Sequence, residues 1–183
     1  FVKTKDKTYP IYFGSNNCFK IRKILAQNKI NPNKVMVIYD RNIPKKILSK
    51  FKNILKKNKH IFLGLNFSEK VKNFNTVKKI LDILGKNNFN RNDCVISIGG
   101  GIAGDICAFA ASIYKRGLKF VNIPSTLLSQ VDSSIGGKTG INNFIGKNMI
   151  GSFCQPNAVI VDIIFLNSLP KKELICGYAE ILK

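Results

Sequence analysis

The sequence is poor in the residues that build metal sites and cross-links. It has a single histidine, His60, and no C-x-x-C pair among its five cysteines. A catalytic zinc usually takes about three protein ligands, often histidines, so this chain alone does not complete such a site. His60 stands among lysines at the start of a predicted strand, and we expect it at the surface. Scattered cysteines predict reduced, buried thiols and a cytoplasmic protein; they are Cys18, Cys94, Cys107, Cys154 and Cys176.

Long apolar segments are also absent. No run approaches the ~18–20 apolar residues that a membrane span requires, and no signal peptide is recognisable. We therefore expect no membrane partner.

Acidic residues are few, with 10 Asp and Glu against 30 Lys and Arg, and a net charge of +20. The excess lies in residues 1–92, which hold 22 basic and 4 acidic residues, whereas residues 93–183 hold 8 and 6. A basic half can indicate nucleic-acid binding. Only four of the basic residues are arginine, however, the side chain that phosphate and base recognition favours. We prefer a solvated lysine-rich surface and expect no nucleic-acid partner.

Apolar runs alternate with helical patterns along the chain. Strands are expected at residues 9–13, 35–39, 61–65, 94–98, 120–123 and 158–161. Helices are expected at residues 18–27, 43–55, 69–84 with Ser68 as the cap, 106–114 and 171–183. Alternation of this kind predicts an α/β, Rossmann-like parallel sheet flanked by helices, with ligands at the carboxyl ends of the strands.

The pattern indicates an α/β domain over residues 1–170 and one further helix, residues 171–183, that could start another domain. The chain starts at Phe1 and its last residues, YAEILK, have the pattern of an uninterrupted helix. We expect a fragment that is truncated at both ends.

A glycine-rich turn follows the strand expected at residues 94–98. Residues 99–104 fit G-x-G-x-x-G, which lets backbone N–H groups and a helix N-terminus approach a pyrophosphate. The turn does not follow the first strand, and no acid stands about 20 residues later, as in the usual dinucleotide fingerprint. Asp40, which ends an earlier strand, is the better candidate for ribose hydroxyls, or else a helix cap. Asp105 is either a cap or a ligand contact.

Residues 124–151 have neither a helical period nor a strand alternation. They are rich in Gly, Ser and Asn and carry Lys138 and Lys147, so they predict an ordered surface that receives an anion. Asp132 and Asn148 belong to the same segment, and Arg116 could contact a phosphate. Each of these side chains could equally lie at the surface.

Two charged pairs have two interpretations each. Glu69 and Lys72 lie three residues apart on one predicted helix face, either as an exposed ion pair or as ligand contacts. Glu180 and Lys183 stand in the same relation on the last helix.

Several blocks together resemble 3-dehydroquinate synthases. They are IGGGIAGDICAFAASIYKRG, FVNIPSTLLSQVDSSIGGKTGIN, GKNMIGSFCQP, FLNSLP and GYAEILK, in that family's order and spacing. The resemblance is dense over residues 94–183 and looser upstream, at YDRN and SEKVK. It departs from the family where Ser125-Thr126 replaces a Thr pair, and where Phe67-Ser68-Glu69 replaces D-G-E.

The resemblance implies a reaction and its cofactors. The family converts a sugar acid phosphate, 3-deoxy-D-arabino-heptulosonate 7-phosphate, into 3-dehydroquinate and phosphate in the shikimate pathway, by oxidation, elimination, reduction, ring opening and aldol closure. It implies NAD, Zn2+ or Co2+, and a homodimer. The family's other two metal ligands are histidines in a following all-helical domain, so the resemblance implies that residues 171–183 are the first helix of that domain. It also implies that this chain alone is inactive.

The resemblance also implies residue roles. The catalytic and substrate-binding residues would be Arg116, Asp132, Lys138, Asn148 and Lys183. The NAD contacts would be Asp40, Glu69, Lys72, Gly101, Ile102, Ala103, Gly104, Asp105, Ser125, Thr126, Lys138, Lys147, Phe165, Leu166, Asn167 and Ser168. Glu180 would be the first metal ligand.

Two other enzyme classes stay open. Another sugar phosphate cyclase, such as a 2-deoxy-scyllo-inosose synthase, would use the same oxidation and elimination logic. A polyol dehydrogenase of similar fold is disfavoured, because such an enzyme exchanges NAD freely and needs no segment like residues 124–151.

Overall fold

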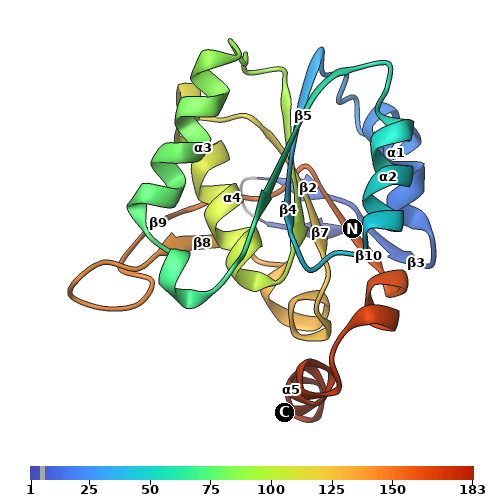
Figure 1. The fold of residues 1–183 in the computed structure, drawn as a ribbon, viewed down its shortest axis with the longest axis vertical. Coiled ribbons are helices and arrows are strands. Elements are labelled where there is room, and N and C mark those ends of the chain that lie inside the picture. Colours follow the sequence, from blue (N-terminus) through green and yellow to red (C-terminus); the bar gives the residue numbers. More distant parts are fainter. Residues whose placement is uncertain (5–6) are drawn as a thin grey trace.

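The computed structural model describes residues 1–4 and 7–183. Its centre is a six-stranded parallel sheet in the order β3-β10-β7-β6-β4-β5 (Figure 1). The strands are β3 (Ile11–Gly14), β4 (Lys34–Asp40), β5 (Lys59–Leu65), β6 (Cys94–Gly99), β7 (Lys119–Pro124) and β10 (Ala158–Asp162). The expected α/β class is confirmed.

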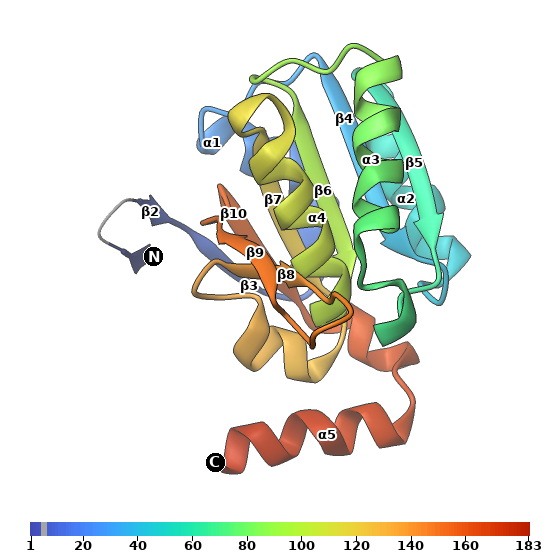
Figure 2. The same cartoon turned by 90° about the vertical axis from the view of Figure 1, so that its left-hand side faces the viewer.

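Helices cover both faces of the sheet (Figures 1 and 2). One face carries α1 (Ile21–Gln27) and α2 (Lys45–Ile54), and the other carries α3 (Phe74–Lys86) and α4 (Gly101–Ile113). Alternate side chains of each central strand enter opposite layers, so both sets must be apolar. This explains why the strands read as continuous apolar runs.

Strand β4 illustrates the two cores. Val35 and Val37 pack in the same cluster as Phe51 of α2, whereas Met36 and Ile38 pack with the buried residues of α3. All five side chains are fully buried. Burying an aliphatic or aromatic side chain of this size contributes about 1.5–3 kcal/mol relative to leaving it in water.

The remaining elements are short. They are β1 (Val2–Lys3), β2 (Thr8–Tyr9), η1 (Asn17–Lys20), η2 (Glu69–Val71), η3 (Tyr114–Arg116), the π-helical turn η4 (Ser129–Ser133), β8 (Lys138–Ile141), β9 (Ile150–Phe153) and η5 (Ile163–Ser168). A last helix, α5 (Lys171–Leu182), lies across the carboxyl ends of the strands (Figure 2).

The helix expected at residues 69–84 is wrong in its first part. The chain forms the 3-10 turn η2, breaks at Lys72 and Asn73, and begins α3 at Phe74. Asn73 is the cap, since its side chain accepts a hydrogen bond of 3.1 Å from the backbone N–H of Thr76. Ser68 makes no side-chain capping bond to the described backbone. An Asn that caps competes with helix continuation, which ends the period early.

Helix α4 starts five residues earlier than expected, at Gly101 instead of residue 106. Gly104 and Asp105 therefore belong to the helix and not to a turn before it, and Asp105 is not a cap. Two glycines in the first turn, Gly101 and Gly104, hide the helix from a propensity argument, because glycine is a poor helix former.

Residues 124–151 are more regular than expected. They contain η4 and an antiparallel hairpin of β8 and β9, in which Gly140 pairs with Gly151. A methyl group at Gly151 would overlap the carbonyl oxygen of Thr139. Each strand has only four residues, so an alternation of side chains is too short to recognise.

The cysteine prediction is confirmed for Cys18, Cys94 and Cys107, which are buried, and all five thiols are unpaired. Burial raises the pKa of Cys107 to about 12. Cys154 is only partly buried, and Cys176 is exposed on α5, so burial was wrongly expected there. His60 is half-buried, with its ring edge on Phe62 at 5.6 Å between centroids. In the described part of the chain, every helix is too short or too polar to cross a bilayer.

Helix α5 is held against η4 by a close contact at Gly177. A methyl group at this position would lie 2.6 Å from Leu127 Cβ and 2.7 Å from the backbone nitrogen of Leu128. Gly177 is therefore required by the approach of the two segments. Gly85, near the end of α3, has nothing within 4 Å of such a methyl group.

These two glycines give a matched test. Alanine favours a helix at both positions, so Gly85→Ala should stabilise the protein by about 0.5–1 kcal/mol. Gly177→Ala should destabilise it by about 1–3 kcal/mol through overpacking and should speed amide hydrogen exchange in α5. Urea denaturation and exchange measurements check both. Equal effects of the two substitutions would contradict the close contact.

Candidate active site

The site lies where the order of the strands reverses. The chain goes from β4 outward to β5 and then returns to β6, on the other side of β4. Helices leave in opposite directions at such a point, and a crevice opens between the carboxyl ends of the two strands. Asp40 ends β4, and Gly99 ends β6 beside it.

The N-terminus of α4 faces this crevice with free donors. The first backbone bond of the helix runs from the N–H of Gly104 to the carbonyl of Gly100, at 3.1 Å. The N–H groups of Gly101, Ile102 and Ala103 thus lack an intrahelical acceptor, and the described residues supply no other. Such a helix terminus binds phosphate groups well.

Glycines occupy the turn because neighbouring side chains lie too close for a Cβ atom. A methyl group on Gly100 would lie 3.1 Å from Thr126 Cγ2, and one on Gly101 would lie 2.8 Å from Ser133 Oγ. The N–H of Ser125 donates to the carbonyl of Gly99 at 2.9 Å. The structure therefore brings Ser125 and Thr126 to the glycine turn.

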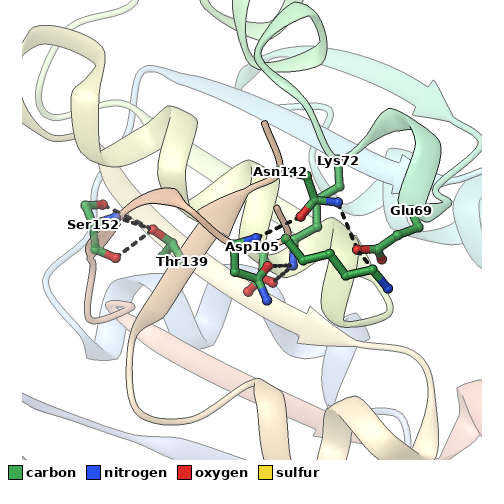
Figure 3. A network of polar contacts seen from close by, with 8 residues as sticks. Glu69, Lys72, Asp105, Thr139, Asn142 and Ser152 are labelled. Atoms are coloured by element: carbon green, nitrogen blue, oxygen red, sulfur yellow. Dashed lines mark hydrogen bonds and ion pairs between the residues drawn. The ribbon is translucent and has the colours of Figure 1, made fainter. Parts of the chain in front are cut away.

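Lys72 is the centre of a polar network beside the turn (Figure 3). Its side chain is only 7% exposed, and its Nζ donates to Asp105 Oδ2 at 2.5 Å and to Asn148 Oδ1 at 2.6 Å. The expected pair of Glu69 with Lys72 on one helix face is wrong, because the chain breaks between η2 and α3. Lys72 instead joins α4 to the segment after β8.

Burial and the ammonium group act on Asp105 in opposite directions. Desolvation raises the pKa of Asp105, and the hydrogen bond and charge of Lys72 oppose that rise. Desolvation also raises the pKa of Asp40, and the Asn42 N–H at 2.9 Å opposes it. Asp40 makes this local turn and is not the cap of α2, whose N-cap is Pro44.

Asn142 joins Glu69 and Asn148 to the network. Its Nδ2 donates to Glu69 Oε1, and its Oδ1 accepts from the Asn148 N–H, both at 2.9 Å (Figure 3). Lys147 Nζ lies 3.9 Å from Glu69 Oε1, and both side chains are largely exposed. That outer ion pair contributes little, about 0–1 kcal/mol.

Two cavities flank the network. One of about 630 Å³ is lined by Asp105, Asp132, Lys138 and Asn148 among others. The other, of about 390 Å³, lies on the side of Glu69, Lys72 and Asn142. Four of the polar residues predicted from residues 99–151 thus share one hollow.

The turn η4, which carries Asp132, is anchored through its first two residues. Thr126 Oγ1 donates to Ser129 Oγ at 2.8 Å. The buried Gln130 donates from Nε2 to the carbonyls of Pro124, at 3.1 Å, and Asp162, at 3.0 Å. Gln130 therefore ties η4 to the carboxyl ends of β7 and β10.

Other predicted residues lie farther out. Arg116 follows the far end of α4, about 18 Å of helix from its N-terminus, and lines neither of the two cavities. Phe165 is buried in the core, whereas η5 as a whole follows β10 at the carboxyl edge and includes Leu166, Asn167 and Ser168. Glu180 and Lys183 pair with each other at 3.5 Å on α5.

The described residues do not make a complete metal site. Among the described residues, no three His, Cys, Asp or Glu side chains come together. Glu180 alone supplies one carboxylate, which is too few ligands for zinc.

Sequence comparison shows the family to which this chain belongs. Residues 63–176 match the family model "3-dehydroquinate synthase N-terminal". The 3-dehydroquinate synthase of Pelagibacter ubique is 56% identical over 182 residues, which are all of this chain and 50% of that protein. The chain belongs to the 3-dehydroquinate synthase family. It spans about half the length of the curated relatives it matches.

Solved structures of other enzymes share the fold of this chain. ValA, a 2-epi-5-epi-valiolone synthase from Streptomyces hygroscopicus with NAD+ and Zn2+ bound, superposes with a TM-score of 0.85 at 25% identity, over 100% of this chain and 50% of ValA. A 2-deoxy-scyllo-inosose synthase with carbaglucose-6-phosphate, NAD+ and Co2+ also gives 0.85, at 23% identity, over 94% of this chain and 48% of its own.

Sequence reasoning missed Asn142 and Gln130. Neither is charged, and their contacts depend on residues 6 to 73 positions away. Their place inside the polar segment 124–151 was the only signal.

The buried ion pair gives a second test. Lys72→Met should leave Asp105 with an unpaired, partly buried carboxylate and cost roughly 1–3 kcal/mol at pH 7. Loss of the Lys72 ammonium group raises the pKa of Asp105 in the folded protein further above its unfolded value. The free energy that the substitution costs therefore grows as pH rises from the unfolded pKa to the folded pKa, and it shrinks as Asp105 becomes protonated at lower pH. Urea denaturation at pH 4 and pH 7 measures both.

Lys78→Met is the matched control. Lys78 pairs with Asp82 at 2.8 Å on α3, where both side chains are more than half exposed. Its loss should cost only about 0.3–0.5 kcal/mol. If Lys72→Met costs no more than Lys78→Met, the buried pair does not stabilise the site.

Proposed function

We propose that the protein is a 3-dehydroquinate synthase. It would convert 3-deoxy-D-arabino-heptulosonate 7-phosphate into 3-dehydroquinate and phosphate. The observation that carries this proposal is the cavity of about 630 Å³ that gathers Asp105, Asp132, Lys138 and Asn148 beside the free N-terminus of α4. Family membership supports the same reaction.

The dinucleotide would lie along the switch point of the sheet. The N–H groups of Gly101, Ile102 and Ala103 fit a pyrophosphate, and Asp40 fits the ribose hydroxyls at the end of β4. The glycine turn leaves room for backbone to approach the phosphates. When bound, NAD would accept a hydride from a ring carbon of the substrate and later return it.

The further NAD contacts proposed from the family pattern surround this turn. They are Glu69, Lys72, Gly104, Asp105, Ser125, Thr126, Lys138, Lys147, Phe165, Leu166, Asn167 and Ser168. Phe165 would act through its backbone, because its side chain is 2% exposed.

The substrate is polyanionic and needs cations and donors. Lys138 is exposed at the start of β8 and lines the larger cavity, where its ammonium can neutralise a phosphate or a carboxylate. Asn148 and Asp132 line the same cavity and fit the sugar hydroxyls as donor and acceptor. Lys183 would approach from α5, and Arg116 is proposed only from the family pattern.

The metal, the second domain and the dimer are proposals of the same kind. Glu180 would be one ligand of Zn2+ or Co2+, and the site would need further ligands from outside this chain. We place the α/β domain at residues 1–170 and the start of a helical domain at residues 171–183. The exposed apolar residues Ile175, Tyr178, Ile181 and Leu182 of α5 fit helices packed on them. We also propose a homodimer.

A 2-deoxy-scyllo-inosose synthase is the second candidate, since one shares this fold. Phosphate release decides between the two. The purified full-length protein, with NAD+ and Co2+ or Zn2+, should release phosphate from the heptulosonate phosphate and not from glucose 6-phosphate. Residues 1–183 alone should release none. Release from glucose 6-phosphate only would overturn the proposal.

Lys138 gives a residue-level test. Lys138→Met should lower kcat/KM by roughly 10²-fold or more, because a phosphate or carboxylate would lose its charge partner. Lys79→Met removes the same charge from the exposed face of α3 and should change kcat/KM by less than about twofold. A similar loss in both variants would indicate a general charge effect and contradict the role of Lys138.

A further inference from the structure

Asn142, the first residue after β8, contacts three of the proposed site residues at once. It forms hydrogen bonds to Glu69, Lys72 and Asn148 through its Nδ2, its backbone N–H and its Oδ1, respectively. We propose that Asn142 is a positioning residue, which fixes Asn148 and Glu69 relative to Lys72 and thereby couples the two sides of the site. The roles of these three partners rest on the proposed function.

The first bond joins two segments of backbone. The N–H of Asn142 donates to the carbonyl of Lys72 at 2.7 Å. Lys72 lies between η2 and α3, so its carbonyl has no helical partner and needs a donor from elsewhere. This bond attaches the end of β8 to the break in the chain that lets Lys72 point at Asp105.

The second bond holds Asn148 in an unusual conformation. Asn148 has a φ of +56°, in the left-handed region that non-glycine residues seldom adopt. Its N–H donates to Asn142 Oδ1 at 2.9 Å, which closes the loop of residues 142–148. Asn148 Oδ1 then accepts from Lys72 Nζ at 2.6 Å. The side chain of Asn142 therefore determines where Asn148 presents its amide.

The third bond orients Glu69. The amide Nδ2 of Asn142 donates to Glu69 Oε1 at 2.9 Å, closer than Lys147 at 3.9 Å. Both ends of the amide are used, one as a donor and one as an acceptor. An aspartate would keep the acceptor for Asn148 but would place a carboxylate against Glu69.

The network is the wall between the two cavities. Asn142, Glu69 and Lys72 line the cavity of about 390 Å³, whereas Asn148 and Asp105 line the cavity of about 630 Å³. A ligand that moves Glu69 or Lys72 on one side must strain or reset the bonds that hold Asn148 on the other. Two sites that share such bonds are coupled reciprocally.

A donor–acceptor exchange tests the proposal in the full-length protein. Asn142→Asp should weaken NAD+ binding about tenfold by titration calorimetry and raise KM for the heptulosonate phosphate by a similar factor. In Asn142→Asp with Glu69→Gln, the new amide of residue 69 can donate to the new carboxylate of residue 142. The double variant should bind NAD+ at least threefold more tightly than the product of the two single effects predicts. Additive or worse losses would overturn the coupling.

Asn143→Asp is the matched control. Asn143 Oδ1 accepts from the N–H groups of Ile145 and Gly146, and aspartate retains both bonds. This neighbouring variant adds the same charge and should alter NAD+ affinity and KM by less than twofold. An equal defect would assign the effect of Asn142→Asp to charge and overturn the proposal.

A ligand-free measurement separates this proposal from the function. In Asn142→Ala, the amide of Asn148 should exchange with solvent at least tenfold faster than in the parent protein, while core amides of β6 keep their rates. Unchanged protection of Asn148 overturns the positioning role whatever the ligand. Absence of NAD+ binding by the parent protein, with faster exchange in the variant, overturns only the proposed function.

Discussion

Parallel pairing of the six strands is the constraint on which the rest of the structure depends. Because every strand runs in the same direction, Asp40, Gly99, Pro124 and Asp162 all end at one edge of the sheet. Each crossover must pass over a face, which places the helices and buries both sides of the strands. The position of the site follows from this arrangement before any polar contact is considered.

The polar contacts then give the edge its chemistry. A lysine that is nearly buried requires an anionic partner, and Lys72 finds it in Asp105 while also bonding Asn148. The same bonds that satisfy the buried charge orient side chains proposed to contact ligands. Stability and preorganisation therefore depend on one set of interactions.

The segment that carries most proposed substrate contacts is a braced structure. Gln130 attaches η4 to two strand ends, the hairpin of β8 and β9 packs along α4, and Gly177 brings α5 close to Leu127. A site mounted on fixed elements holds its groups more accurately than a free loop does. Helix α5 lies across the same edge of the sheet (Figure 2).

Local patterns in the sequence suffice to predict the strands and the parallel sheet, because apolar runs and the glycine turn need no tertiary contact to be recognised, and several ordered sequence blocks identify the family. The sequence also predicts that the segment of residues 124–151 receives a ligand. Only the tertiary structure decided that Lys72 pairs with Asp105, 33 residues away, and with Asn148, 76 residues away. It also decided that the helix expected at residues 69–84 breaks before Phe74. The periodicity of apolar residues does not predict such contacts. They form only when packing brings distant segments together and leaves buried polar groups that need hydrogen-bond partners.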